Sequence, residues 1–133
     1  MPYFSKQSLA KLDSCHNDLI ELFTEIIKTF DCTIKWGFRP EYWQNLYFKQ
    51  GSSKVQWPNS KHNTFPSKAV DAVPYITGIG ATYEDRQCYF FAGYVLRQAE
   101  IMGINIRLGA DWDSDKNIND QAFRDICHFE IIA

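Results

Sequence analysis

Two residues of the chain carry reactive side chains in unexpected surroundings. His62 lies in the stretch NSKHNTFPSKAVD, which is rich in turn-forming residues, and Asp71 interrupts the apolar run AVDAVPYI. A carboxylate in a buried strand costs free energy unless it is paired, hydrogen-bonded or bound to a metal. We therefore expect another part of the chain to bring a partner to Asp71.

Histidines are the obvious candidates for that partner, and the chain has three of them, His16, His62 and His128. His16 falls inside a helical pattern and is interpreted as an ordinary helical side chain. His62 and His128 could meet Asp71 at one end of a sheet. Two imidazoles and one carboxylate, with open positions for water, are the ligands that a catalytic zinc requires. The alternative is that all three are hydrogen-bonded polar residues without a metal.

Asp125 stands three residues before His128 in the string DICHFE. If this segment is helical or tightly turned, the carboxylate lies about one turn away from the imidazole. There it could act as a general base toward the attacking water and later protonate the leaving amine. The Asp-x-x-His spacing also occurs by chance, so spacing alone does not decide between this role and an ordinary polar one.

The composition limits the class of protein. A chain of 133 residues with 45% hydrophobic residues favours one domain with a full core. A net charge of −2 without a basic cluster argues against nucleic-acid binding. No apolar run reaches the ~20 residues of a membrane span, and the first residues lack a secretory-signal pattern, so we expect synthesis in a cytoplasm. No Cys-x-x-Cys pair occurs, which predicts four reduced core thiols at Cys15, Cys32, Cys88 and Cys127.

The spacing of apolar residues predicts the elements that position these side chains. Helical periodicity predicts helices over 8–30 and 83–102, the second with an inward face of Tyr89, Phe90, Ala92, Gly93, Leu96 and Ala99. Shorter helices are expected after Pro40 and near 120–125. Alternating and β-branched segments predict strands at 32–36, 69–76, 104–112 and 128–132. This order favours an α+β fold, with a mixed or antiparallel sheet backed by helices and the candidate zinc site at the edge of the sheet.

The segment between Phe38 and Ser60 ends in a loop whose length is usually functional in a compact domain. Its aromatic residues could line a groove or could pack the loop onto the core. The sequence does not choose between these interpretations for Tyr42, Trp43, Tyr47 and Trp57.

Three strings occur in a characteristic order, SKHNTFPSKAVDAVPY, then GADWDSD, then DICHFE. Together they resemble the zinc D-Ala-D-Ala carboxypeptidase/VanY-like peptidase family, and within it the phage L-alanyl-D-glutamate endopeptidases, which are single-domain endolysins. The string CHNDLIELFTEII resembles the first helix of the family, and WGFRPEYWQNLYFKQGSSKVQWPNSKH resembles its arginine-bearing loop. The resemblance therefore covers nearly the whole chain.

The resemblance implies a role for each candidate residue. The zinc ligands fall on His62, Asp71 and His128, the general base falls on Asp125, and Arg39 would steady the scissile carbonyl as negative charge develops on its oxygen. The chain departs from the family at one point, because eight residues, NTFPSKAV, separate His62 from Asp71 where many relatives have six. Lengthening a loop costs little, so we expect the ligand geometry to be retained. Candidate outer partners of the ligands are Ser60, Asp111 and Glu130.

The function implied by this resemblance is zinc-dependent hydrolysis of the L-Ala-D-Glu bond in the bacterial peptidoglycan stem peptide. Residues 1–133 would form a single peptidase catalytic domain without a separate wall-binding domain. We expect a monomer with neither nucleic-acid nor membrane partners, present in the host cytoplasm until lysis and then at the cell wall. Two alternatives stay open, a D-Ala-D-Ala carboxypeptidase and a catalytically silent wall-binding module of the same fold.

Overall fold

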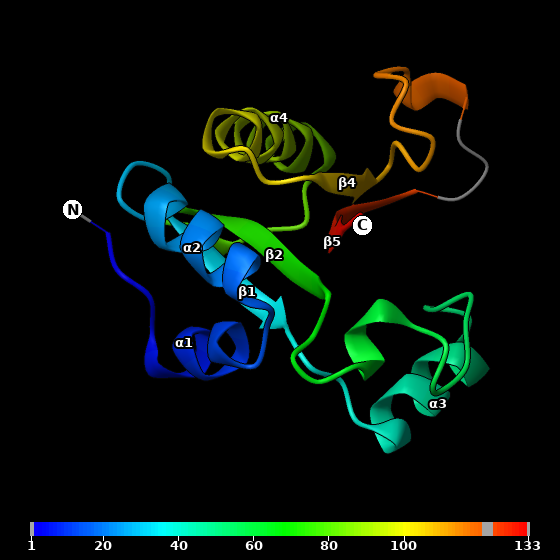
Figure 1. The fold of residues 1–133 in the computed structure, drawn as a ribbon. Helices are drawn as coiled ribbons and strands as arrows, with labels where there is room; N and C mark the ends of the chain where they lie inside the picture. The colour runs from blue at the N-terminus through cyan, green and yellow to red at the C-terminus, as the bar shows by residue number, and fades with distance from the viewer. Residues whose placement is uncertain (1, 121–123, 133) are drawn as a thin grey trace.

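The computed structural model describes residues 2–120 and 124–132. Within these ranges an antiparallel sheet runs through the centre of the molecule in the order β1-β2-β5-β4, and β3 pairs with the far end of β2 (Figure 1). The bounds of the strands are Cys32–Trp36 for β1, Ala69–Ile76 for β2, Gly80–Ala81 for β3, Ile106–Gly109 for β4 and Asp125–Ile131 for β5. The expected α+β fold with an antiparallel sheet is confirmed.

The predicted helix over 8–30 is wrong, because the chain forms two helices, α1 (Lys6–Asp13) and α2 (Asn17–Ile26). His16 stands between them and caps α2, since its Nδ1 accepts a hydrogen bond from the backbone N–H of Asp18 at 3.0 Å. The backbone N–H of His16 donates to the carbonyl oxygen of Ser67 at 2.8 Å. This contact between distant parts of the chain ends the helical hydrogen bonding that the local pattern favours.

Two helices cover one face of the sheet. α2 and α4 (Asp85–Met102) share a core with residues of β2, β4 and β5, and the α4 helix lies above β4 in Figure 1. Val70 and Phe129, which are fully buried, belong to this core. Because side chains alternate along a strand, their neighbours Asp71 and His128 project from the opposite face. Asp71 and His128 thus lie on the two central strands, not on an edge strand.

The predicted inward face of α4 is only partly correct. Ala92 and Ala99 are buried as expected, but Phe90 is 67% exposed, and Phe91 and Val95 take inward positions instead. Nearly every residue of the run CYFFAGYVL is apolar or small, so the spacing does not single out one face. Only packing against the sheet decides it.

Two further elements, α3 (Glu41–Gln50) and η1 (Lys61–Asn63), contribute residues to the side of the sheet that carries the ligands. α3 follows Pro40 as expected, and η1, a 3₁₀ turn, precedes β2. Near the predicted helix at 120–125 the structure has a 3₁₀ turn, η2 (Ile118–Asp120), and residues 121–123 lie outside the described ranges. β5 already begins at Asp125.

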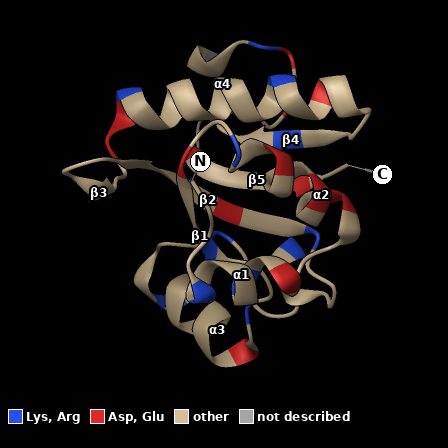
Figure 2. Ribbon diagram, turned by 90° about the vertical axis from the view of Figure 1, so that its left-hand side faces the viewer, with Lys and Arg blue, Asp and Glu red and all other residues tan. Residues whose placement is uncertain are grey.

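The distribution of charge and the state of the cysteines agree with the predictions made from the composition. Acidic and basic residues are interspersed over the helices, as Figure 2 shows. None of the helices among the described residues is long and apolar enough to span a membrane. The four cysteines are all buried and free, which confirms the prediction of reduced core thiols.

Candidate active site

Asp71 and His128 face each other across the central strands. Their Cα atoms are register partners in the β2–β5 pair, and Asp71 Oδ1 lies 3.1 Å from His128 Nδ1. His128 is buried and Asp71 is half-buried. Two residues that are far apart in sequence are therefore held together by the pairing of their strands.

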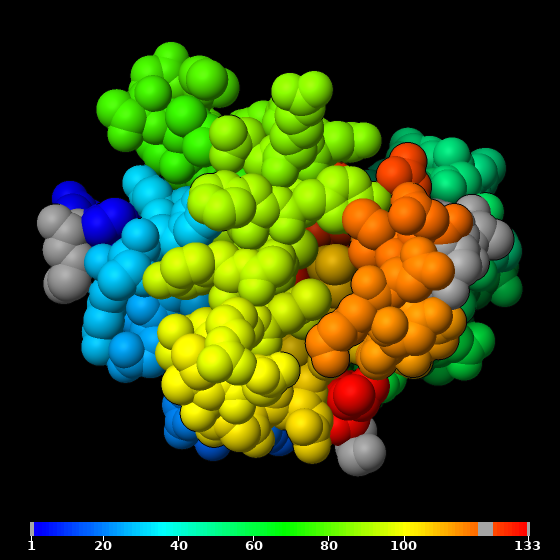
Figure 3. Space-filling model, turned by 90° about the horizontal axis from the view of Figure 1, so that it is seen from above, coloured from blue at the N-terminus to red at the C-terminus, as the bar shows by residue number. Residues whose placement is uncertain are grey.

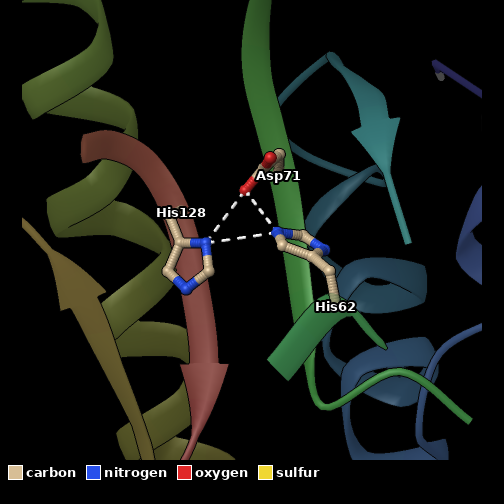
Figure 4. A group of neighbouring side chains, drawn as sticks. All are labelled: His62, Asp71 and His128. Atoms are coloured by element: carbon tan, nitrogen blue, oxygen red, sulfur yellow. Dashed lines mark hydrogen bonds and ion pairs between the residues drawn. The ribbon is translucent and has the colours of Figure 1, made fainter. Parts of the chain in front are cut away.

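His62 reaches the same point from η1. Ser60 caps this turn, since its hydroxyl accepts a hydrogen bond from the backbone N–H of His62 at 3.2 Å. His62 Nε2 lies 3.0 Å from Asp71 Oδ1 and 3.3 Å from His128 Nδ1, and all three side chains point toward one another (Figure 4). The eight-residue spacer keeps these side chains in contact, as we expected.

The outer partners of the two imidazoles decide which nitrogen carries the proton. His62 Nδ1 lies 2.8 Å from the carbonyl oxygen of Gly37, which can only accept a hydrogen bond. His128 Nε2 lies 2.7 Å from Glu130 Oε1, which also accepts. When both rings are neutral, as metal ligands must be, the opposite nitrogens, His62 Nε2 and His128 Nδ1, therefore present lone pairs beside Asp71 Oδ1. Three acceptor atoms within 4.8 Å of one another fit a divalent metal, because a cation between them replaces their repulsion with attraction.

The pKa values of these groups show how strongly they interact. Burial of Asp71 favours its neutral form, but His62 and His128 outweigh burial and hold the pKa of Asp71 far below its usual value. Burial likewise opposes the charged form of His128, but the hydrogen bonds that its ring donates to Asp71 and Glu130 raise its pKa to about 10. Without a metal, the surrounding carboxylates thus keep a proton on the imidazole of His128. A metal cation bound to this ring would have to displace that proton.

Glu130 is the outer partner of His128, as predicted from its place on the strand. Its Oε2 accepts hydrogen bonds from Arg107 Nε at 2.9 Å and lies 3.3 Å from Lys61 Nζ. Burial alone would raise the pKa of Glu130. The hydrogen bond and charge of His128, and then the charges of Arg107 and Lys61, outweigh burial and lower the pKa to about 2. Glu130 is therefore ionised and holds the ring of His128 in place.

Asp111, the other predicted outer partner, takes a different position. Its carboxylate accepts hydrogen bonds from the backbone N–H groups of Asp115 and Lys116 at 3.2 and 2.9 Å. It borders the hollow between α4 and the segment after β4 that is visible in Figure 3. Among the described residues these hydrogen bonds stay within its own loop, so they give no support to the expectation that Asp111 is an outer partner of a ligand.

Arg39 contacts the second carboxylate oxygen of Asp71. Its Nη2 donates to Asp71 Oδ2 at 3.0 Å and its Nη1 donates to Gln44 Oε1 at 3.0 Å. The guanidinium also lies near the faces of Trp36 and Tyr47, with centroid distances of 5.1 and 5.0 Å. These contacts fix the orientation of Asp71. Gln44 is fully buried on α3, and sequence reasoning missed it because a single glutamine in a polar helix carries no signal.

Asp125 joins the ligands in one cleft through an irregularity in β5. Leu108 pairs with Phe129, but the next residue of β4, Gly109, pairs with Asp125, so the register shifts between them. In a regular strand, residues three apart face opposite sides, whereas this shift lets Asp125 and His128 line the same cleft. Burial and then the charge of Asp71 raise the pKa of Asp125. The expected helical or turned spacing is wrong, although the expected proximity is present.

The cleft over these residues has a volume of about 760 Å³. Besides the acidic and imidazole side chains, its lining includes Trp36, Tyr47, Lys61, Tyr83 and Trp112. The ring centroid of Trp112 lies 5.5 Å from that of His128. Sequence reasoning missed Trp36, Tyr83 and Trp112, since nothing in their spacing relates them to the ligands.

The loop aromatics divide between the two interpretations left open above. Tyr47 lines the cleft, whereas Trp57 packs against Phe38 with ring centroids 6.3 Å apart. Tyr42 and Trp43 are 70% and 42% exposed.

Comparisons with known proteins assign the chain to a family. Residues 1–132 match the family model described as phage L-alanyl-D-glutamate peptidase. The L-alanyl-D-glutamate peptidase of Escherichia phage T5 is 28% identical over 136 residues, which cover 97% of each chain. The crystal structure of the L-Ala D-Glu endopeptidase ChiX from Serratia marcescens is similar in fold, with a TM-score of 0.75 and 24% identity over 97% of this chain and 89% of that one. Since the family model spans nearly every residue, this chain belongs to the phage L-alanyl-D-glutamate peptidase family.

Proposed function

We propose that this peptidoglycan peptidase is zinc-dependent and that it cleaves the L-Ala-D-Glu bond of the stem peptide as an endopeptidase. The carrying observation is that His62 Nε2, Asp71 Oδ1 and His128 Nδ1 converge at an open cleft, with proton-bearing nitrogens turned outward. Two imidazoles and a carboxylate form the three-ligand set that leaves a position open for substrate or water. The family of the chain and the names of its relatives support the choice of bond.

Each polar residue of the cleft has a role in this proposal. Zinc held by His62, Asp71 and His128 would polarise the scissile carbonyl and lower the pKa of water. Asp125 takes a proton from the attacking water and passes it to the leaving amine, and its raised pKa suits a group that must both accept and donate. Arg39 holds Asp71, and Glu130 holds His128. The further role of Arg39 at the substrate carbonyl stays a prediction.

A digestion of purified peptidoglycan tests the proposal. Mass spectrometry should find new N-terminal D-Glu, and the product should disappear after chelation and return when zinc is added. Release of free D-Ala would support the carboxypeptidase instead. No product with zinc-loaded protein would support the silent wall-binding module.

The proposal also covers location and assembly. A phage wall peptidase is made in the host cytoplasm and meets its substrate when the wall becomes accessible at lysis. We further propose that the protein acts as a monomer, because one chain supplies all the ligands and the base. Light scattering of the purified protein measures this directly.

A further inference from the structure

The substrate of the proposed function carries a charge beside the bond to be cut. In the stem peptide, D-Glu is linked onward through its γ-carboxyl group, so its α-carboxylate is free unless it is amidated. That carboxylate is attached to the carbon that bears the scissile amide nitrogen. A group that recognises it must therefore lie within about one residue length, ~3.5 Å along the chain, of the reacting atoms.

Lys61 is placed to meet such a group. It precedes His62 in η1 and lines the cleft, and its side chain is 37% exposed. Its Nζ lies 2.8 Å from the carbonyl oxygen of Ile131 and 3.3 Å from Glu130 Oε2. Since Glu130 Oε1 contacts His128, a single carboxylate separates the ammonium group from a candidate metal ligand.

The charge of Lys61 exceeds what its neighbours require. Arg107 already pairs with Glu130 Oε2 through Nε and Nη2, both at 2.9 Å, and His128 donates to Oε1. An ammonium group has three N–H donors, and among the described residues the hydrogen bond of Lys61 goes to Ile131. Lys61 therefore keeps both charge and donors for an anionic ligand.

The other cations of the cleft are less suited to this task. Arg39 is 7% exposed, and its Nη1 and Nη2 groups bond to Gln44 and Asp71. Lys54 lies on the exposed loop after α3, where an ion pair in open water contributes little. Lys61 combines proximity to the ligands with partial burial.

We propose that Lys61 binds the free α-carboxylate of the D-Glu residue and thereby selects stem peptides in which this carboxyl group is not amidated. The inference rests on the proposed function, because it assumes cleavage of the L-Ala-D-Glu bond. A hydrogen bond between charged partners in a partly dehydrated cleft corresponds to a preference of roughly 10–100-fold in kcat/KM.

Two synthetic peptides test the proposal, one with γ-linked D-Glu and one with its α-amide, D-isoglutamine. The zinc-loaded wild-type enzyme should cleave the acid peptide roughly 10–100-fold more efficiently. Lys61→Met should bring this ratio close to one by slowing cleavage of the acid peptide, and Lys61→Arg should retain the preference.

Arg107→Met is the matched control. Arg107 pairs with the same carboxylate of Glu130 but is not part of the described lining of the cleft. Its loss should affect both peptides equally and leave the ratio unchanged. An unchanged ratio in Lys61→Met, or no preference in the wild type, overturns the inference. Failure of the wild type to cleave either peptide overturns the proposed function itself. Circular dichroism and zinc content establish that each variant is folded and metallated.

Discussion

Gly109 and Asp125 pair across β4 and β5 at the point where the register of the two strands shifts. A Cβ atom at Gly109 would lie 2.4 Å from the carbonyl oxygen of Asp125 and 3.1 Å from His128 Cβ. The absence of a side chain at Gly109 therefore lets β5 carry both the candidate base and a candidate ligand into one cleft.

Substitution of this glycine should damage the site without removing any of its polar groups. Gly109→Ala forces β5 away from β4, which should lower kcat/KM by at least tenfold and also lower the melting temperature. Gly93→Ala in α4 is the control, because an added Cβ there meets no atom within 4 Å. It should raise the stability by about 0.5–1 kcal/mol and leave activity unchanged. Wild-type activity in Gly109→Ala would show that the bulge tolerates a Cβ atom.

The ligands and the base should separate in a paired measurement of zinc content and peptide hydrolysis. Asp125→Ala should keep zinc and lose about 10²–10⁴-fold in rate, since Asp125 handles protons and does not belong to the converging donor set. His62→Ala should lose both zinc and activity, because it removes one of three ligands. A fully metallated Asp125→Ala with turnover within a few-fold of the wild type would mean that the base is misassigned.

Glu130 should tune metal affinity without binding the metal. Glu130→Gln keeps an acceptor for His128 Nε2 but removes the negative charge that faces Arg107 and Lys61. We expect a 10–100-fold weaker zinc affinity, measured by competition with a chromogenic chelator. Glu100→Gln, at an exposed pair on α4, is the control and should leave the affinity unchanged. Equal affinities for the two variants would contradict the assigned role of Glu130.

The stability of the chelator-treated protein should depend on pH in a defined direction. The pKa of His128 is raised from 6.5 to about 10, so its stabilising contribution is complete below pH 6.5 and is lost as the pH rises toward 10. The pKa of Glu130 is lowered from 4.5 to about 2, so its contribution is complete above pH 4.5 and is lost as the pH falls toward 2.

The melting temperature without metal should therefore be highest between about pH 4.5 and 6.5. Zinc should weaken the decline on the alkaline side, because it binds the neutral imidazole and stabilises the folded state as the pH rises. Thermal denaturation from pH 4 to 10, with and without zinc, measures both effects. A metal-free protein whose melting temperature rises steadily from pH 6.5 to 10 would contradict the stated coupling of His128.

Local sequence determined the strands and the identity of the reactive groups. The alternating and β-branched segments at 32–36 and 69–76 form strands because their pattern fits a half-buried sheet whatever their neighbours are. Asp71 lies inside such a segment, and a buried carboxylate requires a partner that offsets its charge. The chain has only three histidines that could supply this partner. The sequence could therefore indicate His62, Asp71 and His128, although their roles as ligands stay predictions.

Only tertiary structure decided how these groups are arranged. The contact of His16 with Ser67 ended a helix that local spacing would have continued, and packing on the sheet selected the inner face of α4. The register shift at Gly109 turned Asp125 into the cleft, and contacts between η1 and β5 brought Lys61 beside Glu130. These outcomes depend on contacts between residues distant in sequence, whose free energies do not appear in the pattern of any single segment.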